Sequence, residues 1–448
     1  MAICAAAGTL VVVALLLHGP FPGGSLDGRV APYDVAAVEK EFRIRELTPH
    51  FIPDSRQAWA RLGIALIIGS IGSVGMWSVV VALPAVQSEF GASRGGASLA
   101  FTLTMAGFGL GGVAAGRLTD RFGIVATVVL AAVLMGAGYL AASLSTALWQ
   151  FNLIHLAIGA GASATFGPLM AEASHWFERR RGIAVSIAAT GSYIGGAFWP
   201  PLVNWGIQNH GWRFTHVAVG LVSCGLMLAF LFILRLQMGA GPRRSHIDAP
   251  PPRIDLRLGG HALTMLLFTA GVACCVAMAM PQVHIVAYCG DLGYGAARGS
   301  EMLSLMLACG IISRVGSGFL ADRIGGIRTL LLGSVMQGVA LLFYLFFDSM
   351  VSLYAISAMF GLFQGGIVPG YAIIIREALP ASEAATRVGI VILGTVVGMA
   401  LGGWISGVIF DATGSYAAAF MNGLAWNAVN VTIMVALLLR ARQRLAMA

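Results

Sequence analysis

Arg314 is the residue of this chain with the most distinctive chemistry. It stands in an apolar run from Met302 to Leu320, and no aspartate or glutamate lies within one helical turn of it. A charged side chain at bilayer depth is costly, so it usually faces a cavity or a partner and has a function there. A guanidinium can hold a carboxylate through two parallel hydrogen bonds. Arg314 is therefore a candidate anchor for a carboxylate, and the alternative is an arginine that serves helix packing or gating.

Several polar or aromatic side chains in other apolar runs are candidates to line the same site. His284 is a candidate for carrying a coupling proton, because imidazole titrates near physiological pH, and the alternative is a histidine with a purely structural hydrogen bond. The other candidates offer hydrogen bonds but are also common as packing residues inside membrane bundles. These are Gln282, Tyr371, Gln364, Tyr193 and His155.

The composition indicates which elements must position these side chains. The chain is 58% hydrophobic and 10% charged over 448 residues, with 59 glycines. Repeated apolar runs of about 20 residues are typical of transmembrane helices, and abundant glycine allows such helices to pack closely. The net charge of +8 comes from arginines in short loops rather than from a basic stripe, so the sequence predicts no nucleic-acid partner.

Twelve apolar spans are expected after residue 60, in an all-α polytopic membrane protein. They are 62–84, 97–116, 124–143, 147–170, 182–205, 215–236, 261–288, 299–320, 328–347, 351–375, 387–410 and 415–439. A polar, proline-rich linker over 237–260 divides them into two six-helix bundles, which we place at 61–236 and 261–448.

The distribution of arginines predicts the orientation. Basic residues are concentrated in alternate loops, and the other loops retain only Arg94, Arg213 and Arg298. Because cytoplasmic loops carry the excess of basic residues, both ends of the helical core are expected to be cytoplasmic, in a bacterial-type inner membrane. Residues 1–60 are expected to be an extension. The alternatives are an extra helix over the apolar residues 5–17, or a tail translated from an upstream start.

One motif occurs twice, 202 residues apart. Gly116-Arg-Leu-Thr-Asp120-Arg121-Phe-Gly123 is repeated as Gly318-Phe-Leu-Ala-Asp322-Arg323-Ile-Gly325, and Gly159 matches Gly361 at the same offset. The duplication predicts two related halves with the substrate site between them, near the middle of the membrane. The residues expected to form a gating contact that breaks and reforms as the halves rock are Gly116, Asp120, Arg121, Gly318, Asp322 and Arg323.

This duplicated motif resembles the signature of the major facilitator superfamily, which has twelve helices in two bundles. The stretch from Trp176-Phe177 through Arg179-Arg180-Arg181 to Gly191 is similar to the fifth span of monocarboxylate porters and bacterial oxalate–formate antiporters. The resemblance covers about residues 60–445. It implies that Arg314 occupies the position of the substrate-carboxylate arginine in the eighth span.

Two departures from these families concern the charges near Arg314. Animal monocarboxylate porters have an aspartate one turn before the arginine, where this chain has Gly310. They and the oxalate–formate antiporters also have a lysine within the core, whereas the only lysine here is Lys40. A single deep cation suits one carboxylate better than two, so a monocarboxylate is favoured, while proton coupling stays open.

The sequence therefore predicts a secondary transporter that moves a small carboxylate by alternating access. No motif of an enzyme, a cofactor site or a metal site is recognisable, so neither catalysis nor a cofactor is expected. Three alternatives remain. They are an exporter of drugs or amphiphilic metabolites on the same fold, an exchanger of two carboxylates, and a membrane sensor or scaffold without transport.

Overall fold

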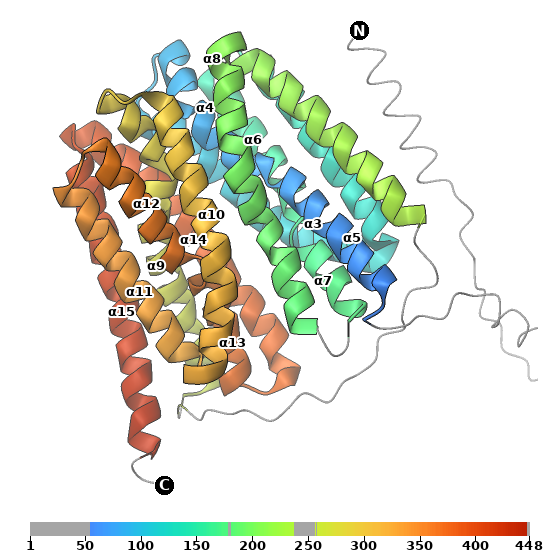
Figure 1. Ribbon diagram of the computed structural model, residues 1–448, viewed down its shortest axis with the longest axis vertical. Helices are drawn as coiled ribbons and strands as arrows, with labels where there is room; N and C mark the ends of the chain where they lie inside the picture. The colour runs from blue at the N-terminus through green and yellow to red at the C-terminus, as the bar shows by residue number, and fades with distance from the viewer. Residues whose placement is uncertain (1–53, 178–180, 237–255, 257, 446–448) are drawn as a thin grey trace, which may run out of the picture.

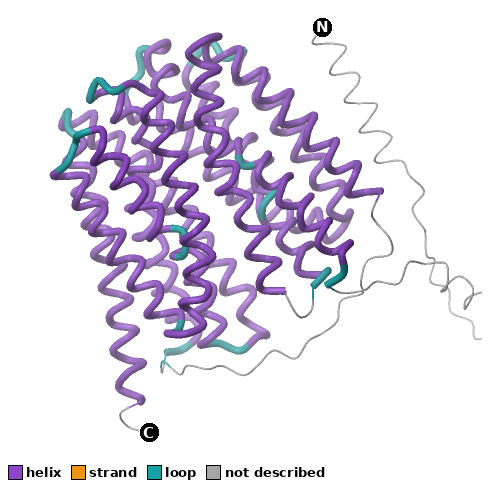
Figure 2. The backbone as a smooth tube through the Cα atoms, viewed as in Figure 1, coloured by secondary structure: helices purple, strands orange, loops and turns teal. Residues whose placement is uncertain are grey.

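The computed structural model describes residues 54–177, 181–236, 256 and 258–445. Within these residues all regular secondary structure is helical, and the helices are joined by short loops (Figure 2). We use "N-terminal half" for helices α3–α8. They are α3 (Arg56–Gly72), α4 (Val74–Phe90), α5 (Arg94–Ser143), α6 (Leu148–Ala164), α7 (Gly167–His175) and α8 (Arg181–Leu236).

We use "C-terminal half" for helices α9–α15. They are α9 (Gly260–Asp291), α10 (Gly295–Ile324), α11 (Gly326–Phe346), α12 (Met350–Gln364), α13 (Ile367–Ala378), α14 (Ala381–Thr413) and α15 (Tyr416–Leu445). Figure 1 shows the two halves side by side, with the blue-to-green helices on one side and the yellow-to-red helices on the other. Most of the expected N-terminal extension and the linker lie outside the described residues, so the domain limits stay predictions.

Ten helical segments of the described chain are long and apolar enough to cross a membrane. Two of them, α5 with 50 residues and α8 with 56, are more than twice as long as the roughly 20 residues that one crossing needs. Each is divided by a glycine with non-helical torsions, Gly123 (φ 83°) in α5 and Gly211 (φ 79°) in α8. Figure 1 shows α8 turning back on itself. With both helices folded back, the ten segments are consistent with the twelve expected crossings.

Three crossings consist of two helices separated by a short break that the sequence analysis did not anticipate. α3 and α4 are separated by Ser73, α6 and α7 by residues 165–166, and α12 and α13 by residues 365–366. The last two breaks lie shortly before Pro168 and Pro369, which have no N–H to continue the helix. Such breaks leave backbone carbonyls free to accept other hydrogen bonds inside the protein.

Contacts between the halves are made chiefly by two helix pairs, α5 with α14 and α8 with α10. In the first pair, the Thr102 hydroxyl donates a hydrogen bond of 2.8 Å to the Ala400 carbonyl. In the second, Gly196 of α8 faces Leu307 of α10, where an added Cβ would lie 2.6 Å from Cδ1 of the leucine. Small residues thus allow close approach at the surface between the halves.

Candidate functional site

Arg314 of α10 lies at the surface between the two halves. Its Nη1 donates a hydrogen bond of 2.8 Å to the Ala189 carbonyl of α8, in the N-terminal half. Its Nε lies 3.4 Å from the Gly365 carbonyl at the break between α12 and α13. The side chain is partly buried, and no carboxylate of the described residues is within ion-pair distance of it. Among the described residues, the guanidinium therefore contacts two backbone carbonyls and no carboxylate.

The Gly365 carbonyl is available to Arg314 because of the sequence that follows it. In a continuous helix this carbonyl would accept from the residue four positions later, which is Pro369 and has no N–H. The next residue pair resumes the helical pattern, since Gly370 N donates to Gly366 O at 3.2 Å. The Gly-Gly-x-x-Pro sequence thus creates a free acceptor beside the arginine.

Tyr193 of α8 forms the second cross-half contact of Arg314. The guanidinium carbon lies 4.5 Å from the centre of the Tyr193 ring, a cation–π geometry. The ring also fills the space at Gly310, where an added Cβ would be 2.4 Å from Tyr193 Cε1. The tyrosine therefore occupies the position, one turn before the arginine, where a side chain on α10 would otherwise lie.

Gln282 and Gln364 form a buried amide pair next to this region. Gln282 Nε2 donates to Gln364 Oε1 at 2.6 Å, joining α9 to the end of α12. Gln364 immediately precedes Gly365, and its own Nε2 is buried without a hydrogen-bond partner. The amide pair is therefore one residue along the chain from the carbonyl that Arg314 contacts, and a shared site for these side chains stays a prediction.

The remaining candidates have their partners elsewhere. His284 Nε2 donates to the Gly403 carbonyl at 2.8 Å, at the α9–α14 contact. The Tyr371 hydroxyl lies 2.9 Å from both the Ala270 carbonyl and Asn430 Oδ1, in a buried network of the C-terminal half. His155 Nδ1 pairs with the Phe151 carbonyl at 2.8 Å, inside the N-terminal half. Each of these three side chains has a structural hydrogen bond.

The duplicated motif has the same backbone conformation in both halves. Gly123 has φ 83° and ψ 168°, and Gly325 has φ 85° and ψ 158°. Thr127 and Thr329, four residues later, each donate a hydroxyl hydrogen bond to the carbonyl of that glycine, at 3.1 and 3.0 Å. Such positive φ values favour glycine, which explains why the motif ends in glycine twice.

The acidic and basic residues of the motif lie on the surface. Asp120, Arg121, Asp322 and Arg323 are exposed, and Gly116 and Gly318 have open space where a Cβ would be. The geometry therefore places these residues beside equivalent turns in the two halves. Their role as a gating contact stays a prediction.

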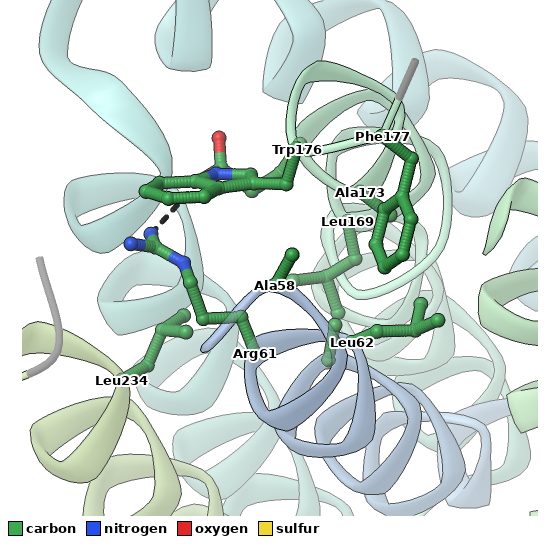
Figure 3. Close-up of a pocket in the computed structure, with 10 residues that line it drawn as sticks. Ala58, Arg61, Leu62, Leu169, Ala173, Trp176, Phe177 and Leu234 are labelled. Atoms are coloured by element: carbon green, nitrogen blue, oxygen red, sulfur yellow. Dashed lines mark hydrogen bonds and ion pairs between the residues drawn. The ribbon is translucent and has the colours of Figure 1, made fainter. Parts of the chain in front are cut away.

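One charged pair, between α3 and α7, is not among the contacts expected from the sequence. The buried Arg61 of α3 donates to Glu172 of α7 at 3.1 Å, and its guanidinium lies 3.7 Å from the centre of the Trp176 ring. Figure 3 shows the indole lying over the guanidinium in a small pocket lined by Leu234, Leu62 and Ala58. The Trp176 Nε1 also donates to Glu172. The sequence signal for this pair is Arg61 itself, because an arginine in the first turns of an apolar span needs an acidic partner nearby.

The fold and these contacts define a multi-pass membrane transporter with two helical halves. The chain belongs to the Major Facilitator Superfamily, whose family profile matches residues 65–351 and 302–446. Members of this class are transporters and not enzymes.

Individual relatives give the finer comparison. The chain is 28% identical to bovine (Bos taurus) monocarboxylate transporter 13 over 386 residues, which covers 82% of this chain and 86% of the relative. It is 24% identical to the agnestins efflux protein AgnL12 of Paecilomyces divaricatus over 324 residues, covering 72% and 73%. The fold is similar to the crystal structure of a bacterial homologue of the human lysosomal transporter Spinster, inward-facing and occupied, with a TM-score of 0.64 at 14% identity, covering 85% of this chain and 94% of that one.

Proposed function

We propose that this transporter moves a small monocarboxylate and that Arg314 is the anchor for its carboxylate. The proposal depends chiefly on the position of the guanidinium. It lies between the halves against two backbone carbonyls and the Tyr193 ring, and no carboxylate of the described residues is within ion-pair distance of it. A relative named as a monocarboxylate transporter, matched over most of both chains, supports the substrate class. A carboxylate forms stronger, charge-assisted hydrogen bonds with a guanidinium than a neutral carbonyl does.

Binding would change the contact between the halves. Arg314 Nη1 now donates to Ala189 of the opposite half. A carboxylate that accepts hydrogen bonds from two parallel N–H groups of the guanidinium competes with the Ala189 carbonyl. Arg314 then loses its hydrogen bond to the opposite half and gains hydrogen bonds to the substrate. Such an exchange is what alternating access requires, because the substrate then alters the balance between two arrangements of the halves.

The charge of the site favours one carboxylate rather than two. Arg314 has no second cation beside it among the described contacts, and its neighbour Tyr193 is neutral. Transferring a second uncompensated carboxylate to this depth would be costly. Gln282 and Gln364 then serve as neutral hydrogen-bonding groups for the rest of a small substrate.

The proposal also covers the orientation of the protein in the membrane and the coupling of transport to protons or to a second carboxylate. The excess of arginines at the end of the helices that carries the duplicated motif favours a cytoplasmic position for that end, in a bacterial-type inner membrane. Proton symport and carboxylate exchange both remain open, and His284, His155 and Tyr371 are retained as candidates for substrate or proton handling. The duplicated motif is the candidate cytoplasmic gate.

A second candidate function is export of amphiphilic metabolites. It is favoured by the similarity to a fungal efflux protein, although that relative is matched over a smaller share of the chain. An exporter of this kind would be indifferent to Arg314 and would accept substrates without a carboxylate. The two functions therefore differ in the effect of a single substitution.

Transport by purified protein in proteoliposomes tests the proposal. Counterflow of labelled acetate, lactate, pyruvate and oxalate is measured for the unmodified protein, for Arg314→Gln and for Arg298→Gln. Arg298 is a matched control, because it forms an exposed ion pair with Glu301 within one half. We expect counterflow of one or more monocarboxylates that is lost in Arg314→Gln and retained in Arg298→Gln. Absence of carboxylate counterflow in correctly inserted protein, together with efflux of an amphiphilic dye, would contradict the proposal and favour the exporter.

A further inference from the structure

Asp411, at the end of α14, binds the first turn of α5 in the opposite half. Its Oδ1 accepts the backbone N–H of Arg94 at 2.7 Å, and its Oδ2 accepts that of Gly95 at 2.7 Å. These N–H groups are free in α5 because they lie at its N-terminus, where the helix dipole also favours a negative charge. A carboxylate of one half thus caps a helix of the other.

The Arg94 side chain extends the same contact to two more helices of the C-terminal half. Its Nη2 forms an ion pair with Asp291 of α9 at 3.0 Å, and its Nη1 donates to the Tyr416 hydroxyl of α15 at 2.6 Å. The guanidinium also lies 4.8 Å from the centre of the Phe410 ring. The Arg94 side chain is only 10% exposed. α9, α14 and α15 therefore converge on one arginine of α5.

The backbones of α5 and α14 approach closely beside these charges. An added Cβ at Gly407 would lie 2.9 Å from Gly95 Cα and 2.7 Å from Ser98 Oγ. An added Cβ at Gly95 would lie 2.9 Å from Val408 Cγ2. The two halves cannot separate at this end without breaking the polar contacts and this glycine packing together.

Hydrogen bonds between the halves lie at this end, and others lie deeper in the bundle, where Thr102 meets Ala400 and Arg314 meets Ala189. We propose that Asp411, Arg94, Asp291 and Tyr416 form a latch that holds this end of the transporter closed and opens in each transport cycle. The latch lies at the end opposite to the duplicated motif, and it acts whatever substrate is carried.

The distance between the halves at the latch end tests this inference in the full-length protein in lipid nanodiscs. Spin labels are attached to cysteines introduced as Leu144→Cys and Val351→Cys. Leu144 directly follows α5 in the N-terminal half, Val351 is in the first turn of α12 in the C-terminal half, and both are exposed. Protein without the two introduced cysteines is labelled in the same way, to measure the signal that comes from the native cysteines. Asp411→Asn weakens the cap, and Tyr416→Phe removes one hydrogen bond while keeping the ring.

The expected result is a second, longer distance in Asp411→Asn, with the ratio of open to closed molecules raised about tenfold, as for the loss of one charge-assisted hydrogen bond. Tyr416→Phe should shift the ratio in the same direction by a smaller factor. Glu301→Gln, which breaks an ion pair inside one half at the same end, should leave the distances unchanged. Identical distance distributions in folded Asp411→Asn or Tyr416→Phe and the unmodified protein would overturn the latch.

Discussion

Gly159 of α6 lies directly against the backbone of Thr104 in α5, so that an added Cβ would be 2.0 Å from the Thr104 carbonyl oxygen. The same relationship recurs 202 residues later, where an added Cβ at Gly361 of α12 would be 2.1 Å from the Met306 carbonyl oxygen of α10. Both members of the pair repeat at the offset of the duplicated motif. The two halves therefore share helix contacts as well as turns, which supports an origin by duplication.

The first prediction concerns these two glycines. Gly159→Ala and Gly361→Ala each force a methyl group into a carbonyl, so the helices must move apart, at a cost of about 1–3 kcal/mol. We expect a lower melting temperature in detergent for both variants, measured by tryptophan fluorescence. Gly316→Ala, at a helical position with open space around the new methyl group, is the matched control and should be neutral or slightly stabilising. Equal melting temperatures for all three variants would contradict the close contact.

The parts of the fold that could be predicted from the sequence are those that residue types specify locally. The apolar runs predicted the helical class, and the limits of the expected spans left connections at 117–123 and 321–327, where Gly123 and Gly325 have positive φ values. Burial in a bilayer and positive φ are strong local constraints on residue type. The breaks before Pro168 and Pro369 carried a local signal too, since proline cannot donate to the preceding turn. The same proline explains the free Gly365 carbonyl at Arg314.

The partners of polar side chains were less predictable. His284 and Tyr371 were grouped with Arg314 because they are polar residues in apolar spans, but their hydrogen bonds go to Gly403 and Ala270. Sequence gives depth along a helix but not rotation about its axis or the neighbouring helix, and these decide which groups meet. The contact of Asp411 with Arg94 was missed for the same reason, since the two residues are over 300 positions apart.

The second prediction concerns the ion pair between the buried Arg61 and the partly buried Glu172. Glu172→Gln removes the negative charge that faces Arg61 at 3.1 Å and weakens the acceptor of the Trp176 indole. Arg61 is buried and Glu172 is 22% exposed, so breaking this pair should cost more than breaking an exposed one, and the variant should melt at a clearly lower temperature. Glu383→Gln is the control, because Glu383 pairs with Arg387 but is 53% exposed, where an ion pair contributes about 0–1 kcal/mol. Similar losses in both variants would show that burial does not strengthen the Arg61 contact.

A third prediction distinguishes a structural from a substrate role for Tyr371. Its hydroxyl bonds with Ala270 and Asn430, and Asn430 in turn donates to Ser334, so the network connects four helices of the C-terminal half. Tyr371→Phe should lower the free energy of unfolding by about 1 kcal/mol, because one buried hydrogen bond is lost. The KM for the transported carboxylate should stay within about twofold, a change of less than 0.5 kcal/mol. A large rise in KM with unchanged stability would instead assign Tyr371 to the substrate site.

The last prediction concerns pH and follows from the chemistry of Arg314. The guanidinium stays protonated in proteins, and no carboxylate of the described residues is within ion-pair distance of it. A small carboxylic acid with a pKa near 4 is ionised throughout the neutral range, so the substrate keeps its negative charge there. The dissociation constant of the carboxylate should therefore change less than about twofold between pH 6 and 8.

This is measured by isothermal titration calorimetry of the purified protein at several pH values, with Arg314→Lys alongside. Lysine keeps the charge but lacks the planar pair of donors, so we expect affinity to fall about tenfold or more at every pH, with the pH profile unchanged. Affinity that rises steeply as pH falls would mean that a protonated group binds together with the substrate. His284 would then be the first residue to replace, with glutamine, which retains an N–H donor for the Gly403 carbonyl but does not titrate.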